Sequence, residues 1–244
     1  MNRFTNKLIL AIFLLFSFGI TPAQAKIKIG TVFFDPPFVM APGQGFNYDL
    51  IATICKGLQE DCQIQQMDFG TLFTAVTNGR VDLAVGISID SQRKNNFIFS
   101  LPYMLSKAQF MISTNNKVKT IANLQNGKIG IIKEDQNGIL YNYLMSQSTY
   151  QFKIVTFDDI EDLITGLNEN TINAAFIHAP SLAYWVQNSD GQFAALGAPV
   201  TLGEGIAFMG LANQQALIQS INQQLQKMET DNAYLNLYKN YFSS

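Results

Sequence analysis

The residues of this chain best suited to binding chemistry follow the apolar run 81–85. Gly86 comes directly after this run, and the pattern predicts a short buried strand that ends in a sharp turn. Asp90 can cap a helix beginning at Ser91, and this helix would hold Arg93 in its first turn. Free backbone N–H groups and a guanidinium would then converge, as carboxylate binding requires. The alternative is an ordinary strand-to-helix turn with a solvated arginine.

A second candidate lies in the loop after the first predicted strand, residues 26–32. Asp35 stands in this loop, and Pro36 and Pro37 prevent the strand from pairing further. Ligands of open α/β sheets bind at the carboxyl ends of the strands, so the Asp35 carboxylate is a candidate ligand contact. An aspartate followed by proline is equally typical of a simple turn.

The N-terminal residues have the layout of a secretory signal. Arg3 and Lys7 precede an apolar run over residues 8–20, and the segment 21–25 ends in Ala-x-Ala. The run is shorter than the about 20 residues that span a bilayer. We therefore expect cleavage after Ala25 and a mature protein in the periplasm, with no later stretch apolar enough to cross a membrane.

The charge of the mature chain restricts its partners. Without residues 1–25, the chain keeps 14 basic and 18 acidic residues, a net charge near −4. Nucleic acid is a poor partner for such a chain. The remaining 219 residues are enough for one large domain or two small ones, and a hydrophobic content of 48% supports packed cores.

Cys55 and Cys62 are the two cysteines of the chain, and both lie in the exported part. An even number of cysteines in an oxidising compartment favours a disulfide. A metal or redox pair is the competing interpretation, but His178 is the single histidine and no Cys-x-x-Cys occurs. We therefore expect no metal site.

The order of the predicted elements indicates an α/β fold. Strands and helices alternate from residue 26 to residue 85, which is typical of a parallel sheet, and the alternation starts afresh at about residue 114. The predicted strands are 26–32, 62–67, 81–85, 97–102, 108–113, 128–132, 153–156 and 173–177, and residues 200–211 are extended and glycine-rich. The predicted helices include 47–58, 72–77, 121–124, 158–167, 180–186, 214–228 and 231–242, and one more follows residue 138.

Short segments along the whole mature chain carry a resemblance to a known family. These segments are Gly45-Phe46-Asn47-Tyr48-Asp49-Leu50, Met67-Asp68-Phe69, Gly79-Arg80-Val81-Asp82-Leu83, Gly86-Ile87-Ser88-Ile89 with Arg93, Phe99-Ser100 with Pro102-Tyr103, Leu124 with Gly127-Lys128-Ile129-Gly130, and Asp231-Asn232-Ala233-Tyr234 with Leu237, Tyr238 and Tyr241-Phe242. In this order and spacing, the chain resembles a periplasmic solute-binding protein of the polar amino-acid type. Such proteins, the bacterial extracellular solute-binding proteins of family 3, are the receptor components of ABC importers.

The resemblance implies an α/β, two-lobed periplasmic binding protein (type II) with two hinge strands. It places lobe 1 at residues 26–110 plus 208–244 and lobe 2 at residues 114–202, with hinges near 111–113 and 203–207. It implies a receptor without catalysis or a cofactor. The lobes of a monomer would close around a small-molecule ligand, an amino acid, and present it to the membrane permease of an ABC transporter.

The resemblance also implies roles for four residues of lobe 1. Arg93 would pair the ligand α-carboxylate, while Ser88 offers its N–H and hydroxyl. Gly86 would accept a hydrogen bond from the α-ammonium through its carbonyl. Phe69 matches the aromatic residue that stacks on the ligand side chain, although a phenylalanine at this position is as often a core residue. The two cysteines match a disulfide seen in basic amino-acid receptors of this type.

Two positions of lobe 2 depart from the family pattern. Where the family has Gly-Thr-Thr or Gly-Ser-Thr, this chain has Glu134-Asp135-Gln136. Asp135 and Gln136 are candidate ligand contacts at the start of a helix, but an acidic side chain there would repel a ligand carboxylate. His178 stands where the family has the aspartate that pairs the α-ammonium. A neutral imidazole accepts one hydrogen bond and brings no negative charge, and a lone histidine is more often structural.

Asp35 or Glu204 could supply the missing negative charge. If Asp35 and Glu134 or Asp135 line the cleft, the expected ligand is a cationic amino acid such as arginine, lysine or ornithine. An enzyme on the same scaffold, of the cyclohexadienyl (prephenate or arogenate) dehydratase type, is the alternative, with altered cleft residues such as His178 as its support. A sensor or adhesion protein with the same fold is a third possibility.

Overall fold

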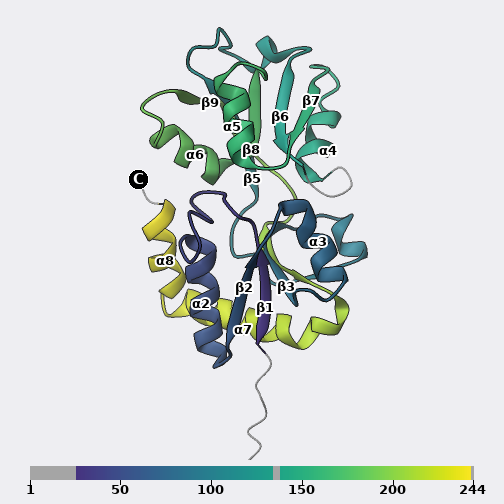
Figure 1. Cartoon of the computed structure of the whole chain (residues 1–244), viewed down its shortest axis with the longest axis vertical. Helices are drawn as coiled ribbons and strands as arrows, with labels where there is room; N and C mark the ends of the chain where they lie inside the picture. Colours follow the sequence, from purple (N-terminus) through teal and green to yellow (C-terminus); the bar gives the residue numbers. More distant parts are fainter. Residues whose placement is uncertain (1–25, 134–137, 243–244) are drawn as a thin grey trace, which may run out of the picture.

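The computed structural model describes residues 26–133 and 138–242, which form two α/β lobes (Figure 1). Each lobe contains a five-stranded mixed sheet with helices packed on both faces. The two lobes lie one above the other in Figure 1, and two chain segments connect them. The fold class expected from the sequence is therefore confirmed.

The sheet of lobe 1 has the strand order β2-β1-β3-β10-β4. β1 is parallel to β2 and β3, as the alternation of strands and helices predicts, while β10 is antiparallel to β3 and β4. The strands are β1 (Ile27–Thr31), β2 (Cys62–Gln66), β3 (Leu83–Ser88), β4 (Ile98–Phe99) and β10 (Ile206–Gly210).

Four helices cover the two faces of this sheet. α2 (Phe46–Leu58), α7 (Gln215–Thr230) and α8 (Ala233–Phe242) share one apolar core, and α3 (Phe69–Thr77) packs on the other face. The apolar residues of α2 recur at helical spacing and are buried. Phe46 is fully buried, and its ring centroid lies 5.0 Å from that of Phe242. The end of the chain therefore returns to lobe 1.

The sheet of lobe 2 has the strand order β7-β6-β8-β5-β9. β6 is parallel to β7 and β8, and β5 is antiparallel to β8 and β9. Helix α4 packs on one face of this sheet, and α5 and α6 pack on the other. The elements are β5 (Lys107–Ser113), β6 (Lys128–Ile132), α4 (Ile139–Ser146), β7 (Lys153–Phe157), α5 (Ile160–Asn168), β8 (Ala174–His178), α6 (Ala179–Gln187) and β9 (Phe193–Thr201).

Cys55 and Cys62 form a disulfide, as expected. Cys55 lies in the last turn of α2, and Cys62 is the first residue of β2. The bond therefore fixes the connection between these two elements at an end of lobe 1.

The segment around Gly86 differs from the prediction. β3 does not end at residue 85 but continues to Ser88, because Ile87 and Ser88 pair with β10. Gly86 bends the strand with a φ of 83°. The helix expected from Ser91 is a short 3₁₀ turn, Arg93–Asn95. β10 comes more than a hundred residues later in the chain, so local sequence could not show this pairing.

The chain crosses between the lobes at different residues from those expected. Residue 104 still bridges to β10 of lobe 1, and β5 of lobe 2 begins at Lys107. The hinge expected near residues 111–113 is therefore wrong, because these residues pair with β8 or β9 inside lobe 2. The return segment joins β9 to β10, and its Leu202 donates a backbone hydrogen bond of 2.8 Å to Ser106 of the first crossing. The apolar pattern predicted the β5 strand but could not show which sheet it joins.

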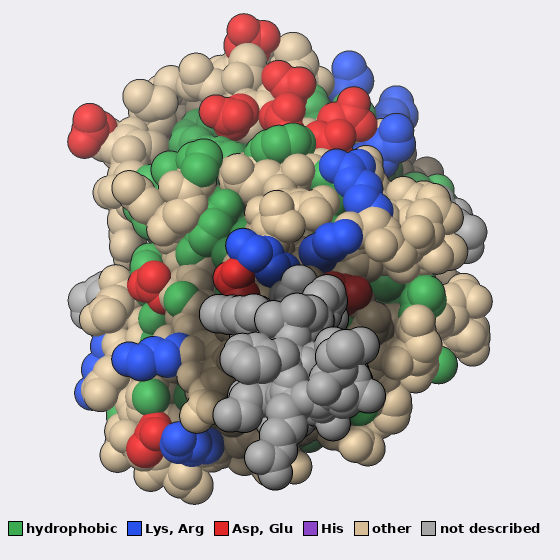
Figure 2. Space-filling view, turned by 60° about the horizontal axis from the view of Figure 1, so that its bottom comes forward, with side chains coloured by type: hydrophobic (Ala, Val, Ile, Leu, Met, Phe, Trp, Pro, Cys, Tyr) green, Lys and Arg blue, Asp and Glu red, His purple; other side chains and the backbone are tan. Residues whose placement is uncertain are grey.

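On the face shown in Figure 2, several acidic side chains lie close together at the top of the view with lysine and arginine side chains beside them, and both kinds are scattered lower down. This mixed surface is consistent with the small net negative charge of the mature chain. In the part of the chain that the structure describes, we find no helix long and apolar enough to span a bilayer.

Candidate functional site

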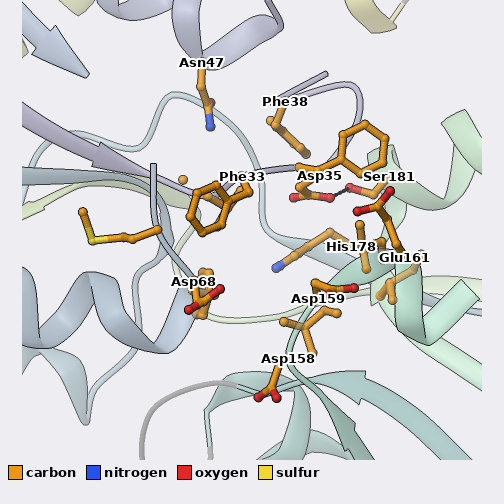
Figure 3. Close-up of a pocket in the computed structure, with 18 of the residues that line it drawn as sticks. Phe33, Asp35, Phe38, Asn47, Asp68, Asp158, Asp159, Glu161, His178 and Ser181 are labelled. Atoms are coloured by element: carbon orange, nitrogen blue, oxygen red, sulfur yellow. Dashed lines mark hydrogen bonds between the residues drawn. The ribbon is translucent and has the colours of Figure 1, made fainter. Parts of the chain in front are cut away.

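A cavity of about 330 Å³ lies between the two lobes (Figure 3). Its walls come from the carboxyl ends of the parallel strands of both sheets, the edge where α/β sheets bind ligands. Lobe 1 contributes the loop after β1, the start of α3 and the bend in β3. Lobe 2 contributes the ends of β6 and β8, residues 158–161 at the start of α5, and Ser181 of α6. The polar and aromatic lining residues are Phe33, Phe34, Asp35, Phe38, Asn47, Asp68, Phe69, Asp158, Asp159, Glu161, His178 and Ser181.

Asp35 links the two lobes. The Ser181 hydroxyl donates a hydrogen bond of 2.7 Å to Asp35 Oδ1, and Figure 3 shows the two side chains pointing toward each other. Asp35 is half-buried, and Ser181 is only 1% exposed. Burial raises the pKa of Asp35 to about 6, although the Ser181 hydrogen bond acts in the opposite direction. This carboxylate therefore sits in a site that penalises an unpaired negative charge.

His178 ends β8 and extends a ring nitrogen toward the space between the lobes (Figure 3). Burial, together with the positive charge of Arg93, lowers the pKa of His178 to about 4, although a backbone hydrogen bond with Lys107 opposes this shift. The imidazole is therefore neutral near pH 7, so it can accept or donate a hydrogen bond but carries no charge.

Four further carboxylates line the cavity at its exposed rim: Asp68, Asp158, Asp159 and Glu161. Asp159 Oδ1 accepts a hydrogen bond of 2.8 Å from the backbone of Asp162 and so caps α5. Asp158 forms an exposed ion pair with Lys133, at 3.6 Å. The lining residues in the described part of the chain thus include five carboxylates and no lysine or arginine. This composition favours a cation in the cavity.

Arg93 lies beside the cavity rather than in its wall. Its side chain is buried, and its guanidinium carbon lies 4.9 Å from the Phe73 ring centroid and 5.9 Å from that of Phe69. Nη1 donates a hydrogen bond of 2.9 Å to the Ser88 carbonyl, and Nε lies 3.4 Å from Asp90 Oδ2.

Asp90 caps the turn that carries Arg93. Asp90 Oδ1 accepts backbone hydrogen bonds from Gln92 and Arg93, at 2.8 and 2.9 Å. The expected capping by Asp90 is thus present although the helix is a single 3₁₀ turn. Ser88 places its hydroxyl 3.1 Å from that of Ser106, where the chain first crosses between the lobes.

The structure brings some of the candidate residues together and separates others. The residues Asp35, Phe69, Gly86 and His178 line one cavity, and Ser88 and Arg93 contact each other next to it. Asp135 and Gln136, together with Glu134, lie outside the described residues. Glu204 does not line the cavity, and its exposed carboxylate pairs with Lys94. In this arrangement the Glu204 carboxylate faces Lys94 and not the cavity.

Sequence reasoning missed the rim carboxylates and Ser181. Asp68 follows the strand 62–67, and residues 158–161 follow the strand 153–156, so the rule that ligands bind at strand ends could have identified them. Ser181 gave no such signal, because its role depends on contact with the other lobe.

Comparison with known proteins supports the expected family. A sequence model of the bacterial extracellular solute-binding proteins, family 3, matches residues 27–244. An arginine-binding periplasmic protein of Mannheimia haemolytica is 26% identical over 214 residues, which cover 83% of this chain and 85% of the relative. A putative ABC transporter arginine-binding protein 2 of Escherichia coli K12 is 25% identical over 244 residues, which cover 96% of this chain and 98% of the relative.

Among solved structures, an arginine 3rd transport system periplasmic binding protein from Legionella pneumophila has a TM-score of 0.83 and 33% sequence identity. The match covers 89% of this chain and 99% of the Legionella protein. The two-lobed fold, the cavity at the strand ends and these similarities agree. The chain belongs to the bacterial extracellular solute-binding proteins, family 3.

Proposed function

We propose that this protein is a periplasmic receptor that binds a cationic amino acid, with arginine as the first candidate, and delivers it to an ABC importer. The observation that carries the proposal is the lining of the cavity, which has five carboxylates and a neutral histidine. Lysine and ornithine share the extra positive charge and are the next candidates. Relatives named as arginine-binding proteins add support.

The ligand contacts follow from the same proposal. The Arg93 guanidinium pairs the α-carboxylate with help from Ser88, and the Gly86 carbonyl accepts from the α-ammonium. Phe69 stacks on the ligand side chain, and Asp35 binds a positively charged group. His178 accepts one hydrogen bond in place of an ion pair. Asp135 and Gln136 stay candidate contacts from lobe 2.

Export and delivery complete the proposal. Residues 1–25 act as a signal that is removed, and the mature chain works as a monomer in the periplasm. The closed lobes then present a surface to the membrane permease of the importer. The relatives found are binding proteins, and nothing in the comparisons favours the dehydratase alternative.

Isothermal titration of the exported protein tests this function. Arginine, lysine and ornithine should bind at least tenfold more tightly than glutamine or glutamate, and salt should weaken their binding because the rim carboxylates are exposed. Asp68→Asn should weaken arginine binding several-fold and fold normally, since asparagine is also a good residue at the start of a helix. Asp190→Asn, an exposed change away from the cavity, is the matched control. Glutamine or glutamate binding as tightly as arginine would overturn the proposal.

A further inference from the structure

One contact between the two lobes joins a loop and a helix. The loop after β1 belongs to lobe 1, and α6 belongs to lobe 2. Phe34 lies edge-on against Trp185, with 6.4 Å between the ring centroids, and Asp35 accepts the hydrogen bond from Ser181. Ser181 and Trp185 are four residues apart on α6, so they lie on one face of the helix. Adjacent loop residues thus reach successive turns of the same helix.

Both partners of this contact are held firmly in their own lobes. The backbone groups of Asp35 and Val39 exchange two hydrogen bonds of 2.9 Å, and Phe38 lies in the core of lobe 1. Ser181 is buried in the first turn of α6, directly after β8. The Asp35–Ser181 hydrogen bond therefore depends on the distance between the lobes and would break when they separate.

Asp35 differs from the other carboxylates of the cavity because it takes part in both the lobe contact and the lining. Among the described residues, Ser181 is the side chain that hydrogen-bonds to its carboxylate, through Oδ1. Oδ2 is left for a group inside the cavity. One neutral hydroxyl does not compensate the negative charge of this half-buried carboxylate, and the raised pKa of Asp35 is consistent with this. A cation beside Asp35 would compensate this charge and remove its energetic cost.

We propose that Asp35 couples the positive charge of the ligand to lobe closure. Ser181 of the opposite lobe takes part in this coupling, because it donates its hydrogen bond to Asp35 only when the lobes are together. The part concerning the ligand rests on the proposed function. Without a cation, closure buries an uncompensated carboxylate, so the open form is favoured. With a cation bound, the same closure forms a compensated pair and the Ser181 hydrogen bond. A ligand drives closure only by binding the closed form better, and Asp35 supplies that difference.

Two variants separate the charge of Asp35 from its hydrogen bond. Asp35→Asn keeps an oxygen that can accept from Ser181 but removes the charge, whereas Ser181→Ala keeps the charge but removes the donor. The matched controls are Asp190→Asn, which removes an exposed carboxylate of lobe 2, and Ser220→Ala, which removes a hydroxyl on α7.

Lobe closure can be measured by energy transfer between dyes on Arg80→Cys in lobe 1 and Glu169→Cys in lobe 2. Both positions are exposed, and the native cysteines are joined in a disulfide and do not react. The closed fraction is measured without ligand and then with arginine, and arginine affinity is measured by isothermal titration.

Asp35→Asn should raise the closed fraction of the ligand-free protein at least threefold and weaken arginine binding at least tenfold. Ser181→Ala should lower the ligand-free closed fraction and weaken arginine binding three- to tenfold, and the controls should match the wild-type protein. The coupling is overturned if Asp35→Asn leaves the ligand-free closed fraction unchanged, or if Ser181→Ala leaves arginine affinity unchanged.

The ligand-free measurements distinguish this inference from the proposed function. If no cationic amino acid binds the wild-type protein but both variants shift the ligand-free closed fraction as described, the proposed function fails, and the dependence of lobe closure on Asp35 and Ser181 stands. If arginine binds the wild-type protein and the variants shift neither quantity, the proposed function stands and the coupling fails.

Discussion

The guanidinium of Arg93 is buried against Phe73 and hydrogen-bonded to the Ser88 carbonyl. If it also pairs a ligand carboxylate, Arg93→Lys should weaken arginine binding by about 1.5–3 kcal/mol, because lysine cannot form the bidentate pair. Agmatine, which is arginine without its carboxylate, should lose little affinity. Titration of both ligands checks this, with the exposed Arg80→Lys as control. An equal loss for both ligands would show that Arg93 does not bind the carboxylate.

Asp35 should make the protein less stable as the pH rises. Its pKa of about 6 in the folded state lies above its ordinary value of 3.8. Between these values the folded state binds more protons than the unfolded state, so the free energy of unfolding falls with rising pH. The free energy of unfolding of Asp35→Asn, relative to that of the wild-type protein, should therefore rise by about 1–2 kcal/mol from pH 4 to pH 7. Urea unfolding without ligand measures this, and a constant difference would contradict it.

His178 should act in the opposite direction. Its pKa is about 4 in the folded state, below the ordinary value of 6.5, so between these values the unfolded state binds more protons. The free energy of unfolding is then lost as the pH falls from 6.5 toward 4. As the pH falls over this range, the free energy of unfolding of His178→Gln should rise by about 1–2 kcal/mol relative to that of the wild-type protein. Urea unfolding over the same pH series measures this difference. If His178→Gln instead loses stability relative to the wild-type protein toward pH 4, His178 is protonated in the folded state.

At the scale of elements, the disulfide joins the end of α2 to the start of β2. It closes a short loop, and the chain-entropy relation assigns such a bond about 2.5 kcal/mol. The double variant Cys55→Ala with Cys62→Ala should lower the free energy of unfolding by about this amount and leave arginine affinity near wild type. Urea unfolding of the oxidised wild-type protein and of the variant gives the difference. Because β2 precedes Asp68, a large loss of affinity would mean that the bond also positions the site.

At the scale of the whole molecule, Gly203 lies in the segment that returns the chain from lobe 2 to lobe 1. Its φ is +62°, and an added Cβ would lie 2.2 Å from the Ile89 carbonyl oxygen and 2.8 Å from Ile139 of lobe 2. Gly203→Ala should therefore destabilise the protein by about 2–4 kcal/mol and change the distance between the lobes.

Gly191→Ala is the matched control for this change. Gly191 has a φ of +77°, and an added Cβ would meet no atom within 4 Å. Gly191→Ala should therefore lower the free energy of unfolding by about 1 kcal/mol, through backbone strain alone. Thermal unfolding and the dye-pair distance compare the two variants. Equal effects would show that the Gly203 segment can shift without moving the lobes.

The sequence by itself determined the alternation of strands and helices, the restart near residue 114, the disulfide and the family. The alternation and the restart rest on local periodicity and turn residues, and the disulfide rests on cysteine number. The family rests on the resemblance of short segments along the chain in their order and spacing. Asp35 could be named as a candidate because it follows a predicted strand, and Phe69, Gly86 and His178 because the resemblance to the family implies or questions ligand contacts at these positions. They do line one cavity.

Only the tertiary structure decided which sheet β5 joins, how far β3 extends and which acidic residue lies deep in the cavity. β3 reaches Ser88 because β10 pairs with it from the far end of the chain. Asp35, and not Glu204, lines the cavity between the lobes, where Ser181 of α6 approaches it from 146 residues later in the chain. Burial and long-range pairing depend on the packing of distant segments, and no local pattern encodes the distance between two lobes.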